Sequence, residues 1–237
     1  MTRKPQKAVV LLSGGMDSAT VLAIVRAKGY EVHALTVDYG QRHAIEVKKA
    51  RRVARAFGVR SHLVLSIDLT KIGGSSLTDK IPVPKRKGQP PLGTVPRIPP
   101  TYVPARNTIL LSLALALAER VRAQDIFIGA NAIDFSGYPD CRPAYLKAFE
   151  SLASLGTKEG IRGKMKFRIH APVLRLTKAE IVKKGLSLGV DFGMTHSCYD
   201  PDPSGRACGR CDSCLLRLKG FREAGIRDPL SYASPPA

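Results

Sequence analysis

Short apolar runs alternate with amphipathic segments along most of the chain. The first run, residues 8–12 (AVVLL), is followed directly by a Ser-Gly-Gly turn, which is typical of a buried parallel strand. The alternation predicts strands at 8–12, 32–37, 62–67, 125–129 and 167–171, and helices at 18–28, 44–57, 108–122, 144–155, 215–224, and from a Thr177 cap to Gly185 or Gly189. Strands that alternate with helices imply right-handed crossovers. The chain is therefore predicted to form an open, doubly wound parallel α/β sheet.

The alternation stops between residues 80 and 104. This stretch holds eight of the 17 prolines and the basic cluster Lys85-Arg86-Lys87, so it forms neither a helix nor an interior strand. Two interpretations are open, a mobile lid over the active site and a disordered insertion, and the composition favours the insertion. We divide the chain into an α/β domain, residues 1–190 with this insertion at about 80–104, and a C-terminal region, residues 191–237.

Length and hydropathy limit the class of protein. A chain of 237 residues that is 44% hydrophobic can bury a substantial core. Its longest apolar run, residues 109–118, is far shorter than the roughly 18 residues that indicate a membrane span. The first seven residues are basic but lack the cleavage pattern of a signal peptide. We expect a cytoplasmic protein, whose cysteines stay reduced and available to metals.

The charge balance is unusual. The chain has 38 basic and 19 acidic residues, which give a formal net charge of +19. Such a field attracts polyanions, including nucleic acid, and phosphorylated small molecules. A generally basic surface suited to the ionic conditions of one cell explains the number equally well. Because charge bears on association and solubility, neither interpretation decides the reaction.

A glycine-rich turn, residues 13–18 (SGGMDS), joins the first predicted strand to the first helix. Ligands bind at this point in doubly wound sheets. The glycines let backbone N–H groups close on an anion, Ser13 and Ser18 add hydroxyl donors, and the helix N-terminus supplies a partial positive charge. Asp17 either caps the helix or binds the magnesium that accompanies phosphates. The turn fits neither the Walker P-loop nor the dinucleotide-binding fingerprint.

Four cysteines near the C-terminus have the spacing of a metal site. Cys208, Cys211 and Cys214 follow one another at intervals of three, and nine residues separate Cys198 from Cys208. Four thiolates suit tetrahedral zinc, and a site with no open coordination position is structural. An iron–sulfur cluster and simple buried thiols are the alternatives. Cys141 stands apart: it is a nucleophile, a persulfide carrier or a small residue that lines a pocket, and we favour the pocket.

Longer segments give the chain a family resemblance. The turn SGGMDS is similar to the SGGxDS signature of the PP-loop ATP pyrophosphatase superfamily. Further segments resemble the 7-cyano-7-deazaguanine synthase family, namely DYGQRH at 38–43, VPARN at 103–107, DFSGYPDCR at 134–142 and the spaced cysteines. The resemblance extends over almost the whole chain. It implies a PP-loop fold, like that of the adenine nucleotide alpha hydrolases, with a small zinc-binding region at the C-terminus.

The resemblance also implies an activity. Enzymes of this family use ATP to convert 7-carboxy-7-deazaguanine and ammonia into the nitrile 7-cyano-7-deazaguanine, a precursor of queuosine and archaeosine. An activated carboxylate, an amide and a second activation form a coherent route, in which the activating step is adenylation or phosphorylation. The implied participants are ATP with Mg²⁺, one structural Zn²⁺ per chain and a second copy in a homodimer. No membrane and no obligatory nucleic acid is implied.

Residue roles follow from the same resemblance. For four of these residues a structural role is the alternative: Asn107 as a helix cap, Arg42 and His43 on a solvated helix face, and Asp38 as a strand-end cap. The expected ATP-binding residues are Leu12, Ser13, Gly14, Gly15, Met16, Asp17, Ser18 and Asp38. The expected substrate-binding and catalytic residues are Arg42, His43, Arg106, Asn107, Asp134, Ser136, Tyr138, Asp140 and Arg142. The expected metal ligands are Cys198, Cys208, Cys211 and Cys214.

Two other functions compete with this one. A PP-loop tRNA-modifying sulfurtransferase would use the positive charge for RNA and Cys141 for sulfur, but it requires a pair of catalytic cysteines near the substrate loop, which the sequence lacks. A nucleic-acid-binding regulator with a zinc finger would leave the SGGMDS turn without purpose. The sequence also has no Cys2His2 spacing.

Overall fold

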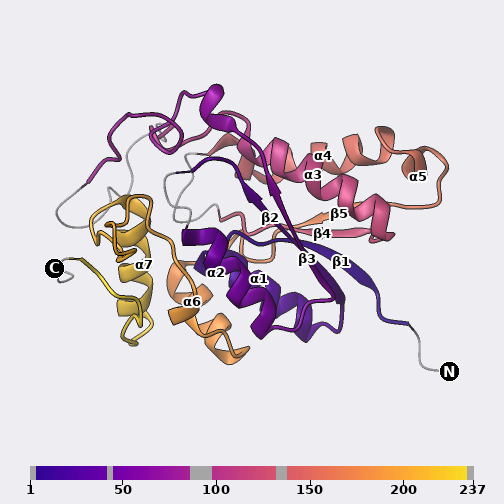
Figure 1. Ribbon diagram of the computed structural model, residues 1–237. Helices are drawn as coiled ribbons and strands as arrows, with labels where there is room; N and C mark the ends of the chain where they lie inside the picture. The colour runs from indigo at the N-terminus through magenta and orange to yellow at the C-terminus, as the bar shows by residue number, and fades with distance from the viewer. Residues whose placement is uncertain (1–3, 42–44, 86–97, 132–137, 234–237) are drawn as a thin grey trace.

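A five-stranded parallel sheet forms the centre of the computed structural model, which describes residues 4–41, 45–85, 98–131 and 138–233 (Figure 1). The strands lie in the order β3-β2-β1-β4-β5. Their bounds are β1 Lys7–Leu11, β2 Glu31–Asp38, β3 Ser61–Ser66, β4 Asp125–Phe127 and β5 Arg168–His170. In the central register, Val9 of β1 pairs with His33 of β2 and with Ile126 of β4. All neighbouring strands are parallel, as the sequence predicts.

Helices cover both faces of the sheet, so the predicted doubly wound α/β fold is confirmed (Figure 1). One face carries α1 Met16–Ala27, α2 Ile45–Ala56 and α6 Lys178–Ser187, and the other carries α3 Arg106–Val121 and α4 Pro143–Leu155. Side chains alternate along β1: Val9 and Leu11 belong to the cluster with α3 and α4, whereas Ala8 and Val10 belong to the cluster with α1 and α2. Burial on both faces explains the apolar run AVVLL.

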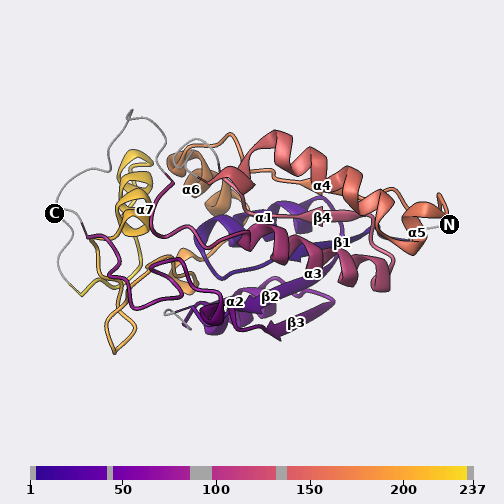
Figure 2. The same cartoon turned by 90° about the horizontal axis from the view of Figure 1, so that it is seen from above.

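Shorter elements complete the chain. They are the 3₁₀ turns η1 Leu69–Lys71, η2 Pro139–Cys141 and η3 Phe192–Met194, and the helices α5 Lys158–Ile161 and α7 Asp212–Glu223. The helix α7 lies beyond the carboxyl ends of the strands, at the opposite end of the molecule from the N-terminus (Figures 1 and 2). Its Phe221 packs edge-to-face on Phe192, with 5.4 Å between ring centroids. Both rings join the hydrophobic cluster of α1 and α6.

The predicted elements differ from the observed ones mainly at their ends. The strand β4 is two residues shorter than predicted, and α7 begins at Asp212 rather than at residue 215. The helix α3 begins at Arg106, two residues early, so that Asn107 lies inside its first turn. Thr177 caps α6 as predicted, in a capping box with Glu180. The apolar run 109–118 forms the middle of α3, and no helix in the described ranges is long and apolar enough to cross a membrane.

The proline-rich stretch is packed wherever the structure describes it. Val83, Thr101 and Val103 are buried, and Lys85 Nζ lies 2.7 Å from a carboxylate oxygen of Asp200 in the C-terminal region. The preference for a disordered insertion is therefore wrong for residues 80–85 and 98–104. Buried valines and a tertiary ion pair fix these two segments, although no regular helix or ladder includes them. Residues 86–97 lie outside the described part of the chain.

The strand order places a switch point between β1 and β4. The chain moves from β1 through β2 to β3 on one side, and then crosses to β4 and β5 on the other side. The loops that follow the two central strands diverge at such a point and leave a crevice at the carboxyl ends of the strands. The glycine-rich turn follows β1 directly, so the fold places it at this crevice.

Candidate active site and metal centre

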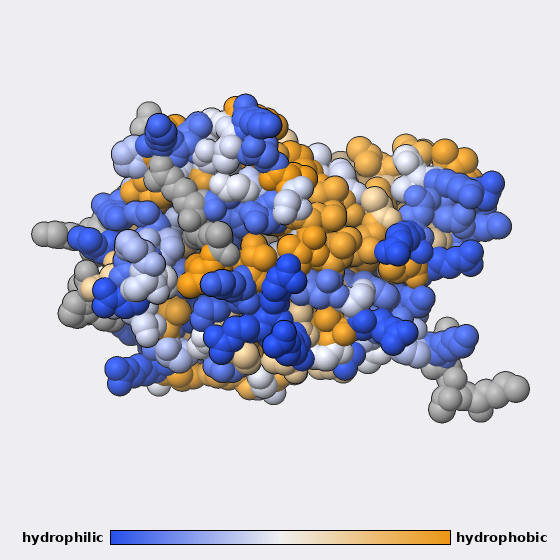
Figure 3. All heavy atoms as spheres, in the orientation of Figure 1, coloured by the Kyte–Doolittle hydropathy of each residue, from blue (hydrophilic) through white to orange (hydrophobic). Residues whose placement is uncertain are grey.

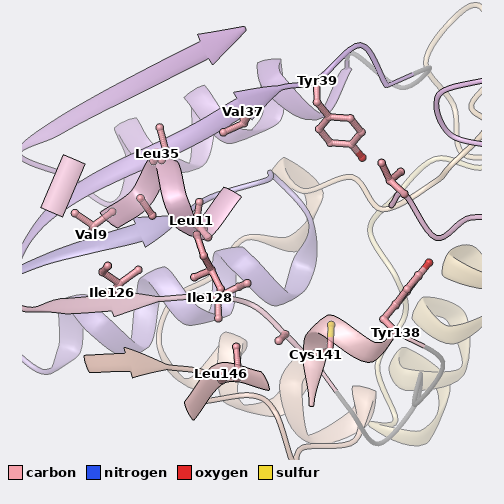
Figure 4. Packing of buried hydrophobic residues seen from close by; sticks show 14 of the residues in the cluster. Val9, Leu11, Leu35, Val37, Tyr39, Ile126, Ile128, Tyr138, Cys141 and Leu146 are labelled. Atoms are coloured by element: carbon pink, nitrogen blue, oxygen red, sulfur yellow. The ribbon is translucent and has the colours of Figure 1, made fainter. Parts of the chain in front are cut away.

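A cavity of about 260 Å³ opens at the switch point, next to the carboxyl ends of β1, β2 and β4. Tyr39 and Tyr138 extend toward it from opposite sides, and Cys141 lies beside Tyr138 (Figure 4). Its walls come from the glycine-rich turn, the loop after β4, the first turns of α3 and α6, and the cysteine-containing region. Segments far apart in the sequence thus share one crevice.

The glycine-rich turn is held by its own hydroxyl groups. Ser18 Oγ accepts a hydrogen bond from the Ser13 N–H at 3.2 Å, and the two Oγ atoms are 3.0 Å apart. The Gly15 N–H donates to Ser13 Oγ at 3.2 Å, and Ser18 Oγ donates to the Gly15 carbonyl at 3.0 Å. The result is a compact loop at the N-terminus of α1, where the helix dipole and free N–H groups favour an anion.

Gly14 allows two other segments to approach this turn. Its φ is +91°, and a Cβ atom there would lie 2.8 Å from the Ala50 backbone nitrogen of α2. The Gly14 carbonyl also accepts the His196 N–H at 2.9 Å, which brings the chain just before Cys198 against the turn. A larger residue at position 14 would separate α2 from the turn.

Asp17 is paired with Lys178, a residue to which the sequence alone did not point. Lys178 Nζ, from the first turn of α6, donates to Asp17 Oδ2 at 2.7 Å, and both residues line the cavity. The other carboxylate oxygen, Oδ1, is buried and has no hydrogen-bond partner in the described part of the chain. The prediction that Asp17 caps the helix is wrong, because α1 begins at Met16 and its N-cap is Gly15. An ammonium group and a carboxylate thus stand together at the turn.

Arg106 is the second cationic residue of the cavity. Its guanidinium carbon lies 5.9 Å from the ring centroids of both Tyr39 and Tyr138, and its Nη1 donates to the Tyr39 hydroxyl at 3.4 Å. Ala105, just before it, has φ +51°, a left-handed conformation that costs an L-residue about 1–2 kcal/mol. Within the described ranges, no carboxylate oxygen lies within 4.0 Å of the guanidinium nitrogens. Strained backbone therefore holds a cation that faces neutral aromatic walls.

The tyrosines around Arg106 are uncharged. Burial raises the pKa of Tyr39, Tyr138 and Tyr199, so their phenols stay protonated at neutral pH. The Tyr138 hydroxyl lies 2.9 Å from Thr101 Oγ1, which connects the end of the proline-rich stretch to the cavity wall. The positive charge of the cavity is thus carried by its arginine and lysine.

Asn107 and Asp140 hold the start of α3 against η2. Asp140 Oδ2 accepts the Asn107 N–H at 3.1 Å and so satisfies one of the free N–H groups at the helix start. The Asn107 side chain donates to the Asp140 carbonyl and to Cys141 Sγ, both at 3.3 Å. The interpretation of Asn107 as the N-cap is wrong, since Ala105 holds that position. Cys141 lines the cavity, and burial raises the pKa of its thiol to about 11.

The structure gathers some of the predicted site residues and leaves others apart. The cavity is lined by Leu12, Ser13, Gly15, Met16, Asp17, Ser18, Arg106, Asn107 and Tyr138. The lining does not include Gly14, Asp38, Asp140 or Arg142. Asp38 accepts the Gly40 N–H at 3.3 Å, and Arg142 is exposed at the start of α4. Arg42, His43, Asp134 and Ser136 lie outside the described residues.

The lining also includes residues that the sequence analysis did not name as site residues, among them Tyr39, Gln41, Lys178 and Tyr199. The sequence could have indicated Lys178. Thr177 is predicted to cap a helix, so Lys178 begins that helix, and helices of a parallel α/β sheet begin at the edge where ligands bind. Tyr39 and Gln41 lie inside the DYGQRH segment, and the Gln41 side-chain oxygen accepts the Tyr39 N–H at 2.8 Å. Tyr199 directly follows a metal-type cysteine. No spacing rule reveals that it reaches the cavity.

The four C-terminal cysteines converge on one point. Their Sγ atoms all lie within 4.8 Å of one another, all four are buried, and none forms a disulfide. Backbone N–H groups point at the sulfur atoms: that of Cys208 donates to Cys198 Sγ at 3.2 Å, and that of Cys211 donates to Cys208 Sγ at 3.3 Å. Buried thiolates need a cation to offset their charge. The donor set therefore fits a structural metal site.

The metal-type centre adjoins the cavity. Ser197 and Tyr199, on either side of Cys198, line the cavity, and so does Ser213, next to Cys214. Ser213 Oγ donates to the Ser197 carbonyl at 2.5 Å, which fixes the start of α7 against the segment that follows η3. The cysteine cluster thus positions part of the cavity wall.

Comparisons with known proteins agree over almost the whole chain. Residues 7–225 match the family model described as queuosine biosynthesis protein QueC. The chain is 60% identical over 229 residues to the 7-cyano-7-deazaguanine synthase of Geobacter metallireducens, covering 97% of this chain and 94% of the relative. It is 60% identical over 234 residues to that of Geobacter sulfurreducens, covering 99% and 95%. The synthase of Myxococcus xanthus is 58% identical over 227 residues, with 96% and 97% covered.

A solved structure shares the fold at much lower identity. It is that of a predicted subunit of a tRNA methyltransferase from Methanocaldococcus jannaschii, which is 14% identical to this chain. The match covers 97% of this chain and 93% of that one, with a TM-score of 0.50. At this identity the similarity concerns the arrangement of strands and helices alone.

Proposed function

Because the chain belongs to the QueC family of queuosine biosynthesis proteins, we propose that the cavity at the switch point is where it makes 7-cyano-7-deazaguanine. The chain is an ATP-dependent enzyme that forms this nitrile from 7-carboxy-7-deazaguanine and ammonia. One observation carries the location: two cationic side chains share the cavity, Lys178 beside the glycine-rich turn and Arg106 among the tyrosines. The first suits phosphates and the second suits a carboxylate.

We place the ATP phosphates at the N-terminus of α1. The N–H groups at the start of α1 and the ammonium of Lys178 are the donors available to them, and the hydroxyls of Ser13 and Ser18 can turn from their contacts within the turn to add two more. The buried, unpartnered Oδ1 of Asp17 is an oxygen ligand of the kind that Mg²⁺ prefers, so we assign the magnesium to it. Bound there, the ion would offset phosphate charge. Asp38 remains a candidate contact for the nucleotide from the end of β2.

The substrate carboxylate would pair with Arg106, which leaves an oxygen free to attack the nucleotide. In adenylation, that oxygen forms a bond to the α-phosphorus and pyrophosphate leaves. Ammonia then displaces AMP and loses one proton, which gives the amide. A second ATP activates the amide oxygen in the same way, and loss of AMP and the two N–H protons gives the nitrile. Phosphorylation with release of ADP would follow the same order and is the alternative.

We further propose that the four cysteine sulfurs hold one Zn²⁺ ion. Four thiolates with no open coordination position suit tetrahedral zinc in a structural role. When bound, the ion would lock Ser197 and Tyr199 into the cavity wall, and it takes no part in the chemical steps. Iron is the competing metal for the same donor set.

A sulfurtransferase is the less favoured function. Relatives of about 60% identity over nearly the full length are synthases. Sulfur transfer also begins from a thiolate, and Cys141 is the one cysteine among the described lining residues. A thiol whose pKa is raised to about 11 is protonated at neutral pH and is a poor nucleophile.

The remaining assignments follow from the family. We propose a homodimer, with catalysis on 7-carboxy-7-deazaguanine, ATP and ammonia as small-molecule substrates, and we retain the division of the chain near residue 190. Arg42, His43, Asp134 and Ser136 stay candidates for substrate binding, and so do Asp140 and Arg142, the first through its hold on α3. Sedimentation equilibrium of the pure protein tests the dimer.

One experiment tests the proposed function. The protein is incubated with 7-carboxy-7-deazaguanine, ATP and ¹⁵N-ammonium, and the products are analysed by mass spectrometry. We expect the nitrile with a single ¹⁵N atom, together with AMP and pyrophosphate. In a second reaction, 7-amido-7-deazaguanine and ATP without ammonium should give the same nitrile. If the amide is not converted, one site does not perform both activations, and if ADP is released, phosphorylation replaces adenylation.

A further inference from the structure

A second depression, of about 830 Å³, lies at the amino ends of the strands, on the edge of the sheet opposite the catalytic cavity. It is formed where the chain enters β1, β2 and β3 and where α3 ends. Its ten lining residues include five cations and a single carboxylate. They are Lys4, Pro5, Lys7, Glu31, His33, Arg60, Ser61, Arg120, Val121 and Arg122. None of them belongs to the site described above.

The cations of this depression are not neutralised by the protein. Its one carboxylate, Glu31, lies 3.4 Å from His33 Nε2 instead. In the ranges that the structure describes, none of the five lysine and arginine side chains has a carboxylate oxygen within 4.0 Å. Some cations elsewhere are paired, as Arg217 is with Asp228 at 2.8 Å. The depression therefore holds a concentrated, uncompensated positive charge.

The fold itself gathers charge at this edge. Helices of a parallel α/β sheet end beside the amino ends of the strands, and α1, α2 and α3 have Arg26, Arg55 and Arg120 in their last turns. The helix dipole accounts for a basic residue in a last turn. It does not account for Arg122, which has φ +58° at a position where glycine is favoured. Figure 3 shows hydrophilic residues at the end of the molecule where the chain begins, as over much of this face.

We propose that this basic depression binds the phosphodiester backbone of a nucleic acid. Clustered, exposed ammonium and guanidinium groups are the usual phosphate ligands, and they carry no information about base sequence. A lipid surface fits less well, because apolar side chains that insert strengthen membrane binding and the depression offers only Pro5 and Val121. Part of the net charge of +19 thus has a place and a partner. The site lies away from the reaction, so both can be occupied together.

Binding can be measured by fluorescence anisotropy with an RNA duplex and a DNA duplex of about 20 base pairs and equal sequence. We expect both to bind with similar Kd, and log Kd to rise linearly with log salt between about 50 and 200 mM, with a slope of about 4–5 for five cations. The triple variant Arg60→Gln, Arg120→Gln, Arg122→Gln should reduce that slope by about 2.7, at 0.9 per cation. Its kcat and KM for nitrile formation should stay unchanged.

A matched control separates the depression from the overall charge. Lys71→Gln, Lys80→Gln and Arg222→Gln remove the same charge from exposed positions outside the depression and should leave the slope unchanged. If both triple variants lower the slope equally, the attraction is diffuse and the proposed site is wrong. Tighter binding to phosphatidylserine vesicles than to either duplex, abolished by the first variant, would assign the depression to membranes and overturn the proposal. Circular dichroism confirms that both variants fold.

Discussion

Lys178 Nζ lies 2.7 Å from Asp17 Oδ2, although the two residues are 161 positions apart in the sequence. Each sits in the first turn of its helix, so the pair fastens the N-termini of α1 and α6 together at the cavity. The lysine side chain is 12% exposed and the aspartate side chain 25% exposed, which limits screening by water. The pair holds an ammonium group beside the position proposed for the phosphates.

Asp17→Ala tests the phosphate assignment. We expect kcat to fall by at least about a hundredfold while the fold stays intact, because the change removes the proposed magnesium ligand and the partner of Lys178. Steady-state kinetics and circular dichroism measure the two effects. Lys184→Ala, at an exposed position of α6, the helix that carries Lys178, is the control and should behave like the unmodified protein. Normal turnover in a folded Asp17→Ala variant would contradict the placement of the phosphates and magnesium at this turn.

Gly220 of α7 controls the position of Lys178. A Cβ atom at residue 220 would lie 2.5 Å from Lys178 Cβ and 2.9 Å from its carbonyl carbon, so the two helices must separate. We expect Gly220→Ala to raise the KM for ATP several-fold, through loss of the alignment between Lys178 and Asp17, with a smaller effect on the KM for the deazaguanine. Arg222→Ala, an exposed change on the same helix, should alter neither constant. Equal changes in both constants would indicate a general loss of packing instead.

Local patterns predicted the core of the fold because the sheet is buried on both faces. The run AVVLL must be apolar at every position to form β1 between two layers of helices, and the glycine-rich turn must follow it to reach the ligand edge. The cysteine spacing is equally local, since three of the four residues lie within seven positions. These features could therefore be predicted from the sequence alone.

Contacts between distant segments could not be predicted from the sequence. The Asp140 carboxylate accepts a backbone N–H at the start of α3 from 33 positions away. The sequence does not show this contact, and it suggested Asn107 as the cap of α3 instead. Arg106 lies in the first turn of α3, after Ala105 in a left-handed conformation. Alanine rarely adopts that conformation, so the sequence does not predict it. The proline-rich stretch looked disordered because its order comes from tertiary contacts, such as that of Lys85 with Asp200, and not from regular elements.

Arg106→Gln should distinguish the two halves of the reaction. The proposed partner of Arg106 is the substrate carboxylate, which the amide intermediate lacks. We expect kcat/KM for 7-carboxy-7-deazaguanine to fall about a hundredfold, in line with the loss of a charge-assisted hydrogen bond, and kcat/KM for 7-amido-7-deazaguanine to fall much less. Parallel assays of the two substrates give the ratio. An equal loss for both substrates would show that Arg106 acts on the nucleotide and not on the carboxylate.

Cys211→Ser tests the metal centre. A thiolate zinc site contributes on the order of 10 kcal/mol of folding free energy in isolated peptides, although the main core supplies part of that here. We expect metal content and solubility to fall together, while molecules that stay folded still bind ATP. Elemental analysis should find one zinc per chain in the unmodified protein and in the control Cys141→Ser. Iron with a visible charge-transfer band, or an active preparation without metal, would contradict the zinc assignment.

Asp125 should make the free energy of unfolding depend on pH in the acidic range. Its carboxylate accepts hydrogen bonds from Arg168 at 2.7 and 2.8 Å and lies 2.7 Å from His170 Nε2. Burial raises the pKa of this group, but the contacts with His170 and Arg168 outweigh burial and lower the pKa to about 2. Because the folded pKa lies below the unfolded value of about 3.9, the ionised group contributes about 2–3 kcal/mol of stability above pH 4. That contribution is lost as the pH falls through about 2.

The comparison with Asp125→Asn isolates this effect. The substitution removes the charge at every pH, so the difference in unfolding free energy between the two proteins should shrink as the pH falls from about 4 to about 2, reaching about half its neutral value near pH 3. Arg168 is 43% exposed in its side chain, so in the variant water can solvate the guanidinium. Urea unfolding from pH 6 down to pH 2 provides the measurement. A difference that stays constant over this range would mean that the variant loses packing or hydrogen bonds, and not a carboxylate held in its ionised form.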